Sequence, residues 1–189
     1  MVNKLITAGK ILAPIILIGG IAGFLFAPPK QVGYAPEQPI PYNHQLHAGE
    51  YGIDCQYCHS GVTLGKKAGV PATNVCMNCH GGIVGAAKPD VKKLKSIYNS
   101  GKSPEWIRVH NLPDHVRFSH GPHIKALLKE GAPTKEACVA CHGDIANMPV
   151  VTQVKSLNMG FCVNCHRNHR DEDVYKSKGV SVSCNVCHY

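Results

Sequence analysis

The chain of 189 residues is long enough for one domain of modest size or for two small ones. Only 6% of its residues are aromatic, whereas it contains 10 cysteines and 12 histidines, which is far from the usage of ordinary globular proteins. This composition argues against an enzyme built around a large core of protein side chains, and against a disordered low-complexity chain. Disulfides, metals or large cofactors must therefore supply part of the interior.

The N-terminal region contains a hydrophobic segment. Residues 11–27 carry no charge, and extension back to Leu5 adds only Lys10. As a helix, the extended segment of about 23 residues spans about 34 Å, close to the thickness of a bilayer core. Lys4 and Lys10 precede the uncharged residues 11–27, which favours a cytoplasmic N-terminus. We expect residues 1–27 to form one uncleaved membrane-anchoring helix that places the rest of the chain outside the cytoplasm.

The alternative for this segment is a cleaved secretory signal, for which residues 20–22 offer the small residues of a cleavage site. Residues 28–41 then contain five prolines and are expected to form an extended linker. The remaining residues, 42–189, are expected to form the functional domain.

Every cysteine of the chain belongs to one repeated pattern, Cys-x-x-Cys-His. This is the attachment signature of c-type haem, because two thioether bonds hold the porphyrin and the adjacent histidine becomes the proximal iron ligand. The sequence therefore predicts five covalent c-type haems. The haem-attaching cysteines are Cys55, Cys58, Cys76, Cys79, Cys138, Cys141, Cys162, Cys165, Cys184 and Cys187, and the proximal histidines are His59, His80, His142, His166 and His188.

Zinc sites and redox-active dithiols are the alternatives to haem. A zinc site does not require a histidine after the second cysteine, and chance would place one there about one time in 16, so five such coincidences have odds of about one in a million. A thioredoxin-like protein needs one such motif rather than five. Haem is therefore the favoured interpretation.

The charge of the chain must be counted with these haems. The formal net charge is +8, and each oxidised haem with its two propionates contributes about −1, which leaves about +3. The basic excess mainly compensates the propionates. Basic stretches interleaved with aromatic residues are missing, so we expect no nucleic-acid partner.

Two parts of the chain share one order of motifs. Residues 42–80 and 116–166 each carry aromatic-x-His-x-x-His at or near their start, from Tyr42 and from Phe118, and continue with two haem motifs, and the fifth motif, residues 184–188, follows as a tail. This repetition indicates an internal duplication of a two-haem module.

Regular secondary structure should be sparse. Helices are expected over Pro89–Asn99, Gly121–Lys129 and Asp171–Lys178, with single helical turns at the haem motifs and no set of alternating strands. The predicted fold class is a single N-terminal transmembrane helix followed by a multihaem cytochrome c domain, in which short helices and long loops wrap around stacked haems.

The second axial ligand of each iron should come from the seven histidines outside the motifs. In His-x-x-His, two imidazoles leave one helical turn toward neighbouring haems. We expect His44 to bind the first haem and His47 the second or third. By the same order, His120 serves the third haem, and His123 the fourth or a neighbouring one.

The ligand of the last haem is less directly indicated. His110 and His115 lie in one segment between the two repeated units, and one or both are expected to bind iron. Met148 and Met159 are thioether candidates, for which packing is the favoured role. His169 is a less favoured candidate than His110 and His115.

Beyond this general pattern, several longer strings carry a specific resemblance. The chain resembles class III multihaem cytochromes and, more closely, the pentahaem cytochrome subunit of bacterial alternative complex III, a quinol:electron-acceptor oxidoreductase. A related menaquinone reductase complex uses a similar subunit. The resemblance extends over nearly the whole chain and is carried by residues 27–30, 39–49, 109–116 and 159–162.

This resemblance implies a set of partners and a location. The expected partners are polytopic quinol-binding membrane subunits, an iron–sulfur subunit and a monohaem cytochrome c. The expected location is the cytoplasmic (inner) membrane, with the haem domain on its periplasmic face.

The expected function is electron transfer from quinol oxidation, through five haems, to a downstream cytochrome, copper protein or oxidase. Haems with two protein ligands have no open iron, so the isolated chain is expected to exchange electrons rather than to transform a substrate. The alternatives are a menaquinone reductase subunit, a small membrane-anchored quinol dehydrogenase, and a catalytic multihaem reductase with one open haem.

Overall fold

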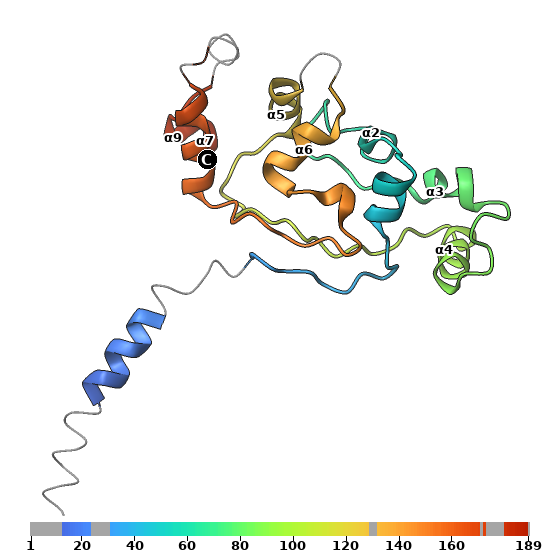
Figure 1. Cartoon of the computed structure of the whole chain (residues 1–189), viewed down its shortest axis with the longest axis horizontal. Helices are drawn as coiled ribbons and strands as arrows, with labels where there is room; N and C mark the ends of the chain where they lie inside the picture. The colour runs from blue at the N-terminus through green and yellow to red at the C-terminus, as the bar shows by residue number, and fades with distance from the viewer. Residues whose placement is uncertain (1–12, 24–30, 129–131, 171, 173–179, 189) are drawn as a thin grey trace, which may run out of the picture.

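The computed structural model describes residues 13–23, 31–128, 132–170, 172 and 180–188, and within them the regular structure is helical. The described residues form no β-strand, only one isolated antiparallel bridge between Val116 and His188. The expectation of short helices joined by long loops is confirmed for this part of the chain. Figure 1 shows these helices set along extended connections rather than in layers.

Nine elements have defined bounds beyond residue 31. They are the π-helix η1 (Gln45–Glu50), α2 (Cys55–Cys58), α3 (Thr73–His80), α4 (Pro89–Asn99), α5 (His120–Leu127), α6 (Lys135–His142), the 3₁₀-helix η2 (Ile145–Asn147), α7 (Met159–His169) and α9 (Cys184–Cys187).

Residues 13–23 are also helical, and their large apolar side chains are exposed. No helix in the described part of the chain is both long and apolar enough to cross a membrane. The rest of the expected anchor, residues 1–12 and 24–27, lies outside the described residues.

Two of the expected helices can be compared with the structure. The predicted bounds of α4 agree with the observed ones: a proline and Asp90 occupy its first turn, Leu94 is buried, and Gly101 follows its end with a φ of 70°. The second, α5, begins one residue earlier than expected and ends at Leu127. The third, Asp171–Lys178, falls almost entirely outside the described residues.

The protein side chains form only a small core. Six hydrophobic residues are buried in the described part of the chain, and three of them, Val62, Ile124 and Ala137, form one cluster. By contrast, Leu64 and Ile83 are 83% and 91% exposed. Since a chain of this length ordinarily buries a continuous apolar interior, the composition correctly indicated that side chains alone do not fill this one.

The segment expected as a linker begins, in its described part, with a turn at residues 31–33, continues from residue 34 without a helix or strand, and is attached to the domain at two places. Near its start, Gly33 N donates to Gln153 O at 2.8 Å, and Gln153 N donates to Tyr34 O at 3.0 Å. Further along, the Gln38 amide donates to Ile107 O and accepts from Ile107 N, both at 2.9 Å. Residues 31–41 therefore form a strap along one side of the domain (Figure 1).

Candidate functional site

Each Cys-x-x-Cys pair lies on a helical turn. In α2 and α9 the two cysteines begin and end a single turn, whereas in α3, α6 and α7 the motif lies within a longer helix. Positions i and i+3 of a helix lie on the same face, so both thiols of a motif point the same way. This is the arrangement that two bonds to one porphyrin edge require.

The first aromatic-x-His-x-x-His unit brings three rings together. Tyr42 lies edge-on to His44 at 4.8 Å and stacks on His47 at 4.5 Å between ring centres. Burial raises the pKa of the Tyr42 hydroxyl, and the nearby Cys58 and Cys76 raise it further. This unit therefore lies between the first and second haem motifs.

The second unit has the same geometry. Phe118 lies edge-on to His120 at 4.9 Å and packs at 4.7 Å, with a 32° tilt, against His123. Matching ring arrangements in two separate segments support the internal duplication indicated by the sequence.

Six histidines have their Nδ1 atom opposite a backbone carbonyl. A carbonyl only accepts, so Nδ1 must carry the proton, which leaves the Nε2 lone pair free to bind a metal. The partners are Asn43 O for His47 (2.8 Å), Gly69 O for His59 (2.6 Å), Val84 O for His80 (3.0 Å), Lys66 O for His120 (2.8 Å), Ser119 O for His123 (2.7 Å) and Ser181 O for His166 (2.7 Å).

Two proximal histidines face a histidine from a His-x-x-His unit. The ring centres are 6.1 Å apart for His47 and His80, and 5.9 Å apart for His123 and His166. Two imidazoles on opposite sides of one metal have centres about 6.2 Å apart, given metal–nitrogen bonds of about 2.0–2.1 Å and about 1.1 Å from nitrogen to ring centre. Both pairs therefore have room for one iron between them.

The fifth motif faces the segment between the two units. The rings of His115 and His188 are stacked at 5.5 Å with a 17° interplanar angle. The bridge between Val116 and His188, together with the hydrogen bond from Arg117 N to Cys187 O at 2.7 Å, holds the motif against this segment. The backbone contact explains why His115, rather than a closer residue in sequence, is brought to His188.

The third motif has two histidines beside it. His120 lies parallel to His142 at 6.4 Å, whereas His110 lies edge-on at 4.3 Å. Burial, together with the neighbouring His110, His120 and His59, lowers the pKa of His142 to about 4. Two polar atoms here, His110 Nε2 and His142 Nδ1, are buried without a partner, which is unusual unless a further group satisfies them.

The first motif lies near His44. Burial, followed by the neighbouring His59 and His47, lowers the pKa of His44 to about 4. Its Nδ1 atom is buried and has no hydrogen-bond partner. A neutral imidazole in such a position is in the protonation state that binds a metal.

The less favoured ligand candidates have other surroundings. His169 Nδ1 lies 2.7 Å from Glu172 Oε1, and Met159 is 66% exposed. Met148 N donates to Ile145 O, and its carbonyl accepts from Gln45 N, which joins η2 to η1. None of these three residues belongs to a pair of facing histidine rings. The assignment of ligands stays a prediction.

Cysteines of different motifs lie close together, and these contacts define a spatial order. Burial raises the pKa of the Cys58 thiol, and Cys76 of the second motif raises it further. A side-chain hydrogen bond joins Cys55 of the first motif to Cys138 of the third, lowering the pKa of Cys55 and raising that of Cys138. The first motif therefore lies between the second and the third.

The remaining contacts continue this row. Burial raises the pKa of Cys141 in the third motif, and Cys165 and Cys162 of the fourth raise it further. Burial also raises the pKa of Cys162, and Cys187 of the fifth motif adds to the effect. The spatial order of the motifs is thus second, first, third, fourth, fifth, which Figure 1 shows as α3, α2, α6, α7 and α9 across the domain. The sequence carried no local signal for this order.

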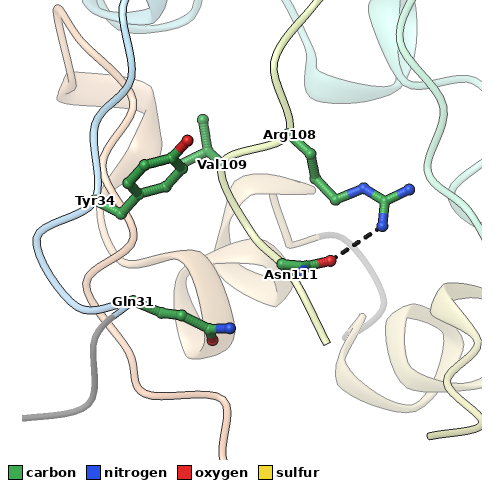
Figure 2. A pocket seen from close by; sticks show the side chains of 5 residues that line it. All are labelled: Gln31, Tyr34, Arg108, Val109 and Asn111. Atoms are coloured by element: carbon green, nitrogen blue, oxygen red, sulfur yellow. Dashed lines mark hydrogen bonds between the residues drawn. The ribbon is translucent and has the colours of Figure 1, made fainter. Parts of the chain in front are cut away.

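Two hollows are found in the described part of the chain. One, of about 460 Å³, lies between the strap and residues 108–111, and Figure 2 shows the Arg108 guanidinium turned to Asn111 Oδ1 at 3.0 Å, with Tyr34 and Gln31 across from them. The other, of about 350 Å³, is mainly apolar and is lined by residues of the first two motifs and their approach: Ile53, Asp54, Tyr57 and Cys79.

The donor set of the site suits haem. None of the ten cysteines is paired in a disulfide, and among the described residues no group of three or more His, Cys, Asp or Glu is arranged around one ion position. The histidines instead face each other in pairs beside paired thiols, and several buried polar atoms lack partners. A flat group bound at its edge by two cysteines and through its metal by two imidazoles fits these features.

Comparison with known proteins gives one informative relative. No protein-family model matches the chain. The menaquinone reductase multihaem cytochrome c subunit of Nitratidesulfovibrio vulgaris (strain Hildenborough) is 30% identical to it over 172 residues, a match that covers 85% of this chain and 80% of the relative.

Proposed function

Because this chain belongs to the family of the multihaem cytochrome c subunit of menaquinone reductase, we propose that it is the electron-transfer subunit of a membrane-bound quinone oxidoreductase and carries five covalent haems. The observation that supports this most directly is the set of facing imidazoles at 5.5–6.1 Å beside the Cys-x-x-Cys turns. Bound haem would supply one-electron chemistry at each position.

We assign two imidazoles to each haem, which leaves no open iron. The residues that hold the haems do so through two thioethers and two Nε2 atoms at each position. The pairs are His59 with His44, His80 with His47, His142 with His120, His166 with His123, and His188 with His115. Such a chain exchanges electrons without transforming a substrate, so no catalysis is expected from the isolated subunit.

The protein tunes these sites mainly through hydrogen bonds and burial. A carbonyl that accepts from Nδ1 makes the imidazole a stronger donor to iron, which favours the oxidised state. His142 lacks such a partner, so its haem is expected to have a higher potential than one ligated by His47 and His80. Spectroelectrochemical titration of the five haems tests this difference.

The row of motifs supports a linear path for electrons. An electron that enters beside α3 passes the second, first, third, fourth and fifth positions before it leaves beside α9, or travels in the reverse direction. In the complex proposed here, polytopic quinol-binding subunits, an iron–sulfur subunit and a monohaem cytochrome c are the partners. We place the haem domain on the periplasmic side of the inner membrane, a proposal supported by the apolar composition of residues 11–27.

Two directions of electron flow are candidates. A complex of the alternative complex III kind oxidises quinol and delivers electrons to a cytochrome or oxidase. The relative named as a menaquinone reductase subunit favours the opposite direction, in which electrons reach quinone. Incubation of the purified complex with quinol and oxidised acceptor, and separately with quinone and reduced donor, distinguishes the two by which reaction turns over.

Intact mass and EPR of the purified chain test the basic assignment. The expected mass exceeds that of the polypeptide by five haems, and the ferric EPR spectrum contains only low-spin signals. A mass equal to the bare polypeptide refutes the haem assignment, and a high-spin signal at one haem revives the catalytic multihaem reductase.

A further inference from the structure

The two ends of the motif row differ in charge. Residues 76–104, which include the second motif and α4, contain five lysines and one acidic residue, Asp90. One oxidised haem adds about −1, so this end stays basic. At the other end, the described residues of the fifth motif, 180–188, contain no Lys, Arg, Asp or Glu.

Two of the three lysines of α4 lie on its exposed side. Leu94 is buried and Val91 and Ile97 are half-buried, whereas Lys92 and Lys93 are exposed. The flanking lysines 88 and 102 are exposed as well. The one ion pair found among the described residues joins His169 and Glu172, far from α4 in the sequence, so these ammonium groups are not neutralised by carboxylates there.

An apolar surface adjoins these lysines. The loop between α3 and α4 exposes 91% of Ile83 and 53% of Val84. Lys95 Nζ donates to Gly82 O at 2.7 Å, which fixes this loop to α4. An apolar centre within a charged rim is the usual anatomy of a transient protein interface.

The same loop leads directly to a proposed iron ligand. His80 Nδ1 donates to Val84 O at 3.0 Å, so a molecule seated on Ile83 and Val84 would be linked through the Val84 carbonyl to His80, the proposed proximal ligand of the second haem. Cys79 of this motif is exposed. The surface therefore combines access to a terminal haem with charge that attracts an acidic partner.

We propose that the α4 surface, formed by Ile83, Val84, Lys88, Lys92, Lys93 and Lys102, docks an acidic electron-transfer protein at the second haem. This rests on the proposed function, because it takes the row of haems as the electron path. The interface is of the small, weak kind typical of redox encounters, below about 1,200 Å². Electrostatic steering then sets the association rate.

The test follows electron entry by stopped-flow absorption of the haem bands. Full-length haem-loaded protein in detergent is mixed with reduced flavodoxin, an acidic flavoprotein used as the probe, and separately with a small uncharged reductant. The docking variant is Lys92→Glu with Lys93→Glu. The control variant, Lys67→Glu with Lys135→Glu, makes the same charge change at exposed lysines near the middle of the row.

The docking variant is expected to lose about 10-fold or more of the flavodoxin rate at low ionic strength, and to lose most of its salt dependence. Its rate with the uncharged reductant and its haem content should equal those of the wild type. Ile83→Ser is expected to slow flavodoxin at high salt as well, because it removes the apolar centre without changing charge.

Two results overturn the docking surface: an unchanged flavodoxin rate in the docking variant, or an equal loss in the control variant. If the wild type is not reduced by the small uncharged reductant either, the proposed electron-transfer function fails, and the docking surface fails with it.

Discussion

Replacement of His120 by alanine tests the geometry of the third haem site. The His120 ring lies parallel to His142 at 6.4 Å, close to the spacing of about 6.2 Å required for two imidazoles across one iron. The His110 ring lies at 4.3 Å and edge-on, about 2 Å too close for an iron between the rings. His120→Ala is therefore expected to remove the second ligand of this haem, and His110→Ala is not.

The size of the effect follows from the number of sites. One haem of the proposed five becomes five-coordinate, so about a fifth of the low-spin ferric signal should convert to high spin. Loss of the hydrogen bond from His120 Nδ1 to Lys66 O at 2.8 Å costs about 1 kcal/mol of stability, which leaves the protein folded and its thioethers intact.

EPR of the ferric protein measures the conversion, and intact mass confirms that every haem is still attached. Free imidazole should restore the low-spin signal in His120→Ala by occupying the vacated position. The reasoning is refuted if His110→Ala produces the high-spin haem while His120→Ala leaves all signals low-spin. A double variant, with both His110 and His120 replaced by alanine, shows whether His110 binds the iron when His120 is lost.

Further predictions address the backbone, the strap and the N-terminal segment. Gly143→Ala should lower the free energy of unfolding by more than about 2 kcal/mol, because the added Cβ would lie 2.5 Å from Val154 Cγ2 and the residue has a φ of 68°. Gly101→Ala is the matched control, because Gly101 has a φ of 70° and no atom lies within 4 Å of an added Cβ. It should cost only the backbone strain of about 1–2 kcal/mol. Gln38→Ala should lose two hydrogen bonds to the domain, worth about 1–3 kcal/mol together. The strap should then be cleaved faster in limited proteolysis, and an unchanged cleavage rate would contradict the role of Gln38 in attaching it. Deletion of residues 1–27 should release a soluble, still red domain, and retention of that domain in washed membranes would show that the segment is not the anchor.

The local features of this protein were accessible from its sequence. The Cys-x-x-Cys-His motifs, the bounds of α4 and the repeated aromatic-x-His-x-x-His units depend on residues within one or two turns of each other. The scarcity of core-forming side chains was also visible in the composition. The family was indicated as well, although the strings favoured alternative complex III, whereas the relative found is a menaquinone reductase subunit.

The long-range features were not accessible in the same way. The contact of Cys55 with Cys138 and the bridge from Val116 to His188 join residues more than 70 positions apart, and nothing in either local sequence specifies the partner. For the same reason the sequence did not determine whether His47 binds the second or the third haem, or whether His110 or His115 binds iron. The expected anchor stays a prediction, since most of the segment lies outside the described residues.

The central place of the third motif has a consequence for damage to the protein. In the proposed row of haems, the first and fourth positions communicate only through the third. A molecule that lacks the haem of the third motif would hold two separate pairs of cofactors, second with first and fourth with fifth, and would conduct no electrons from end to end.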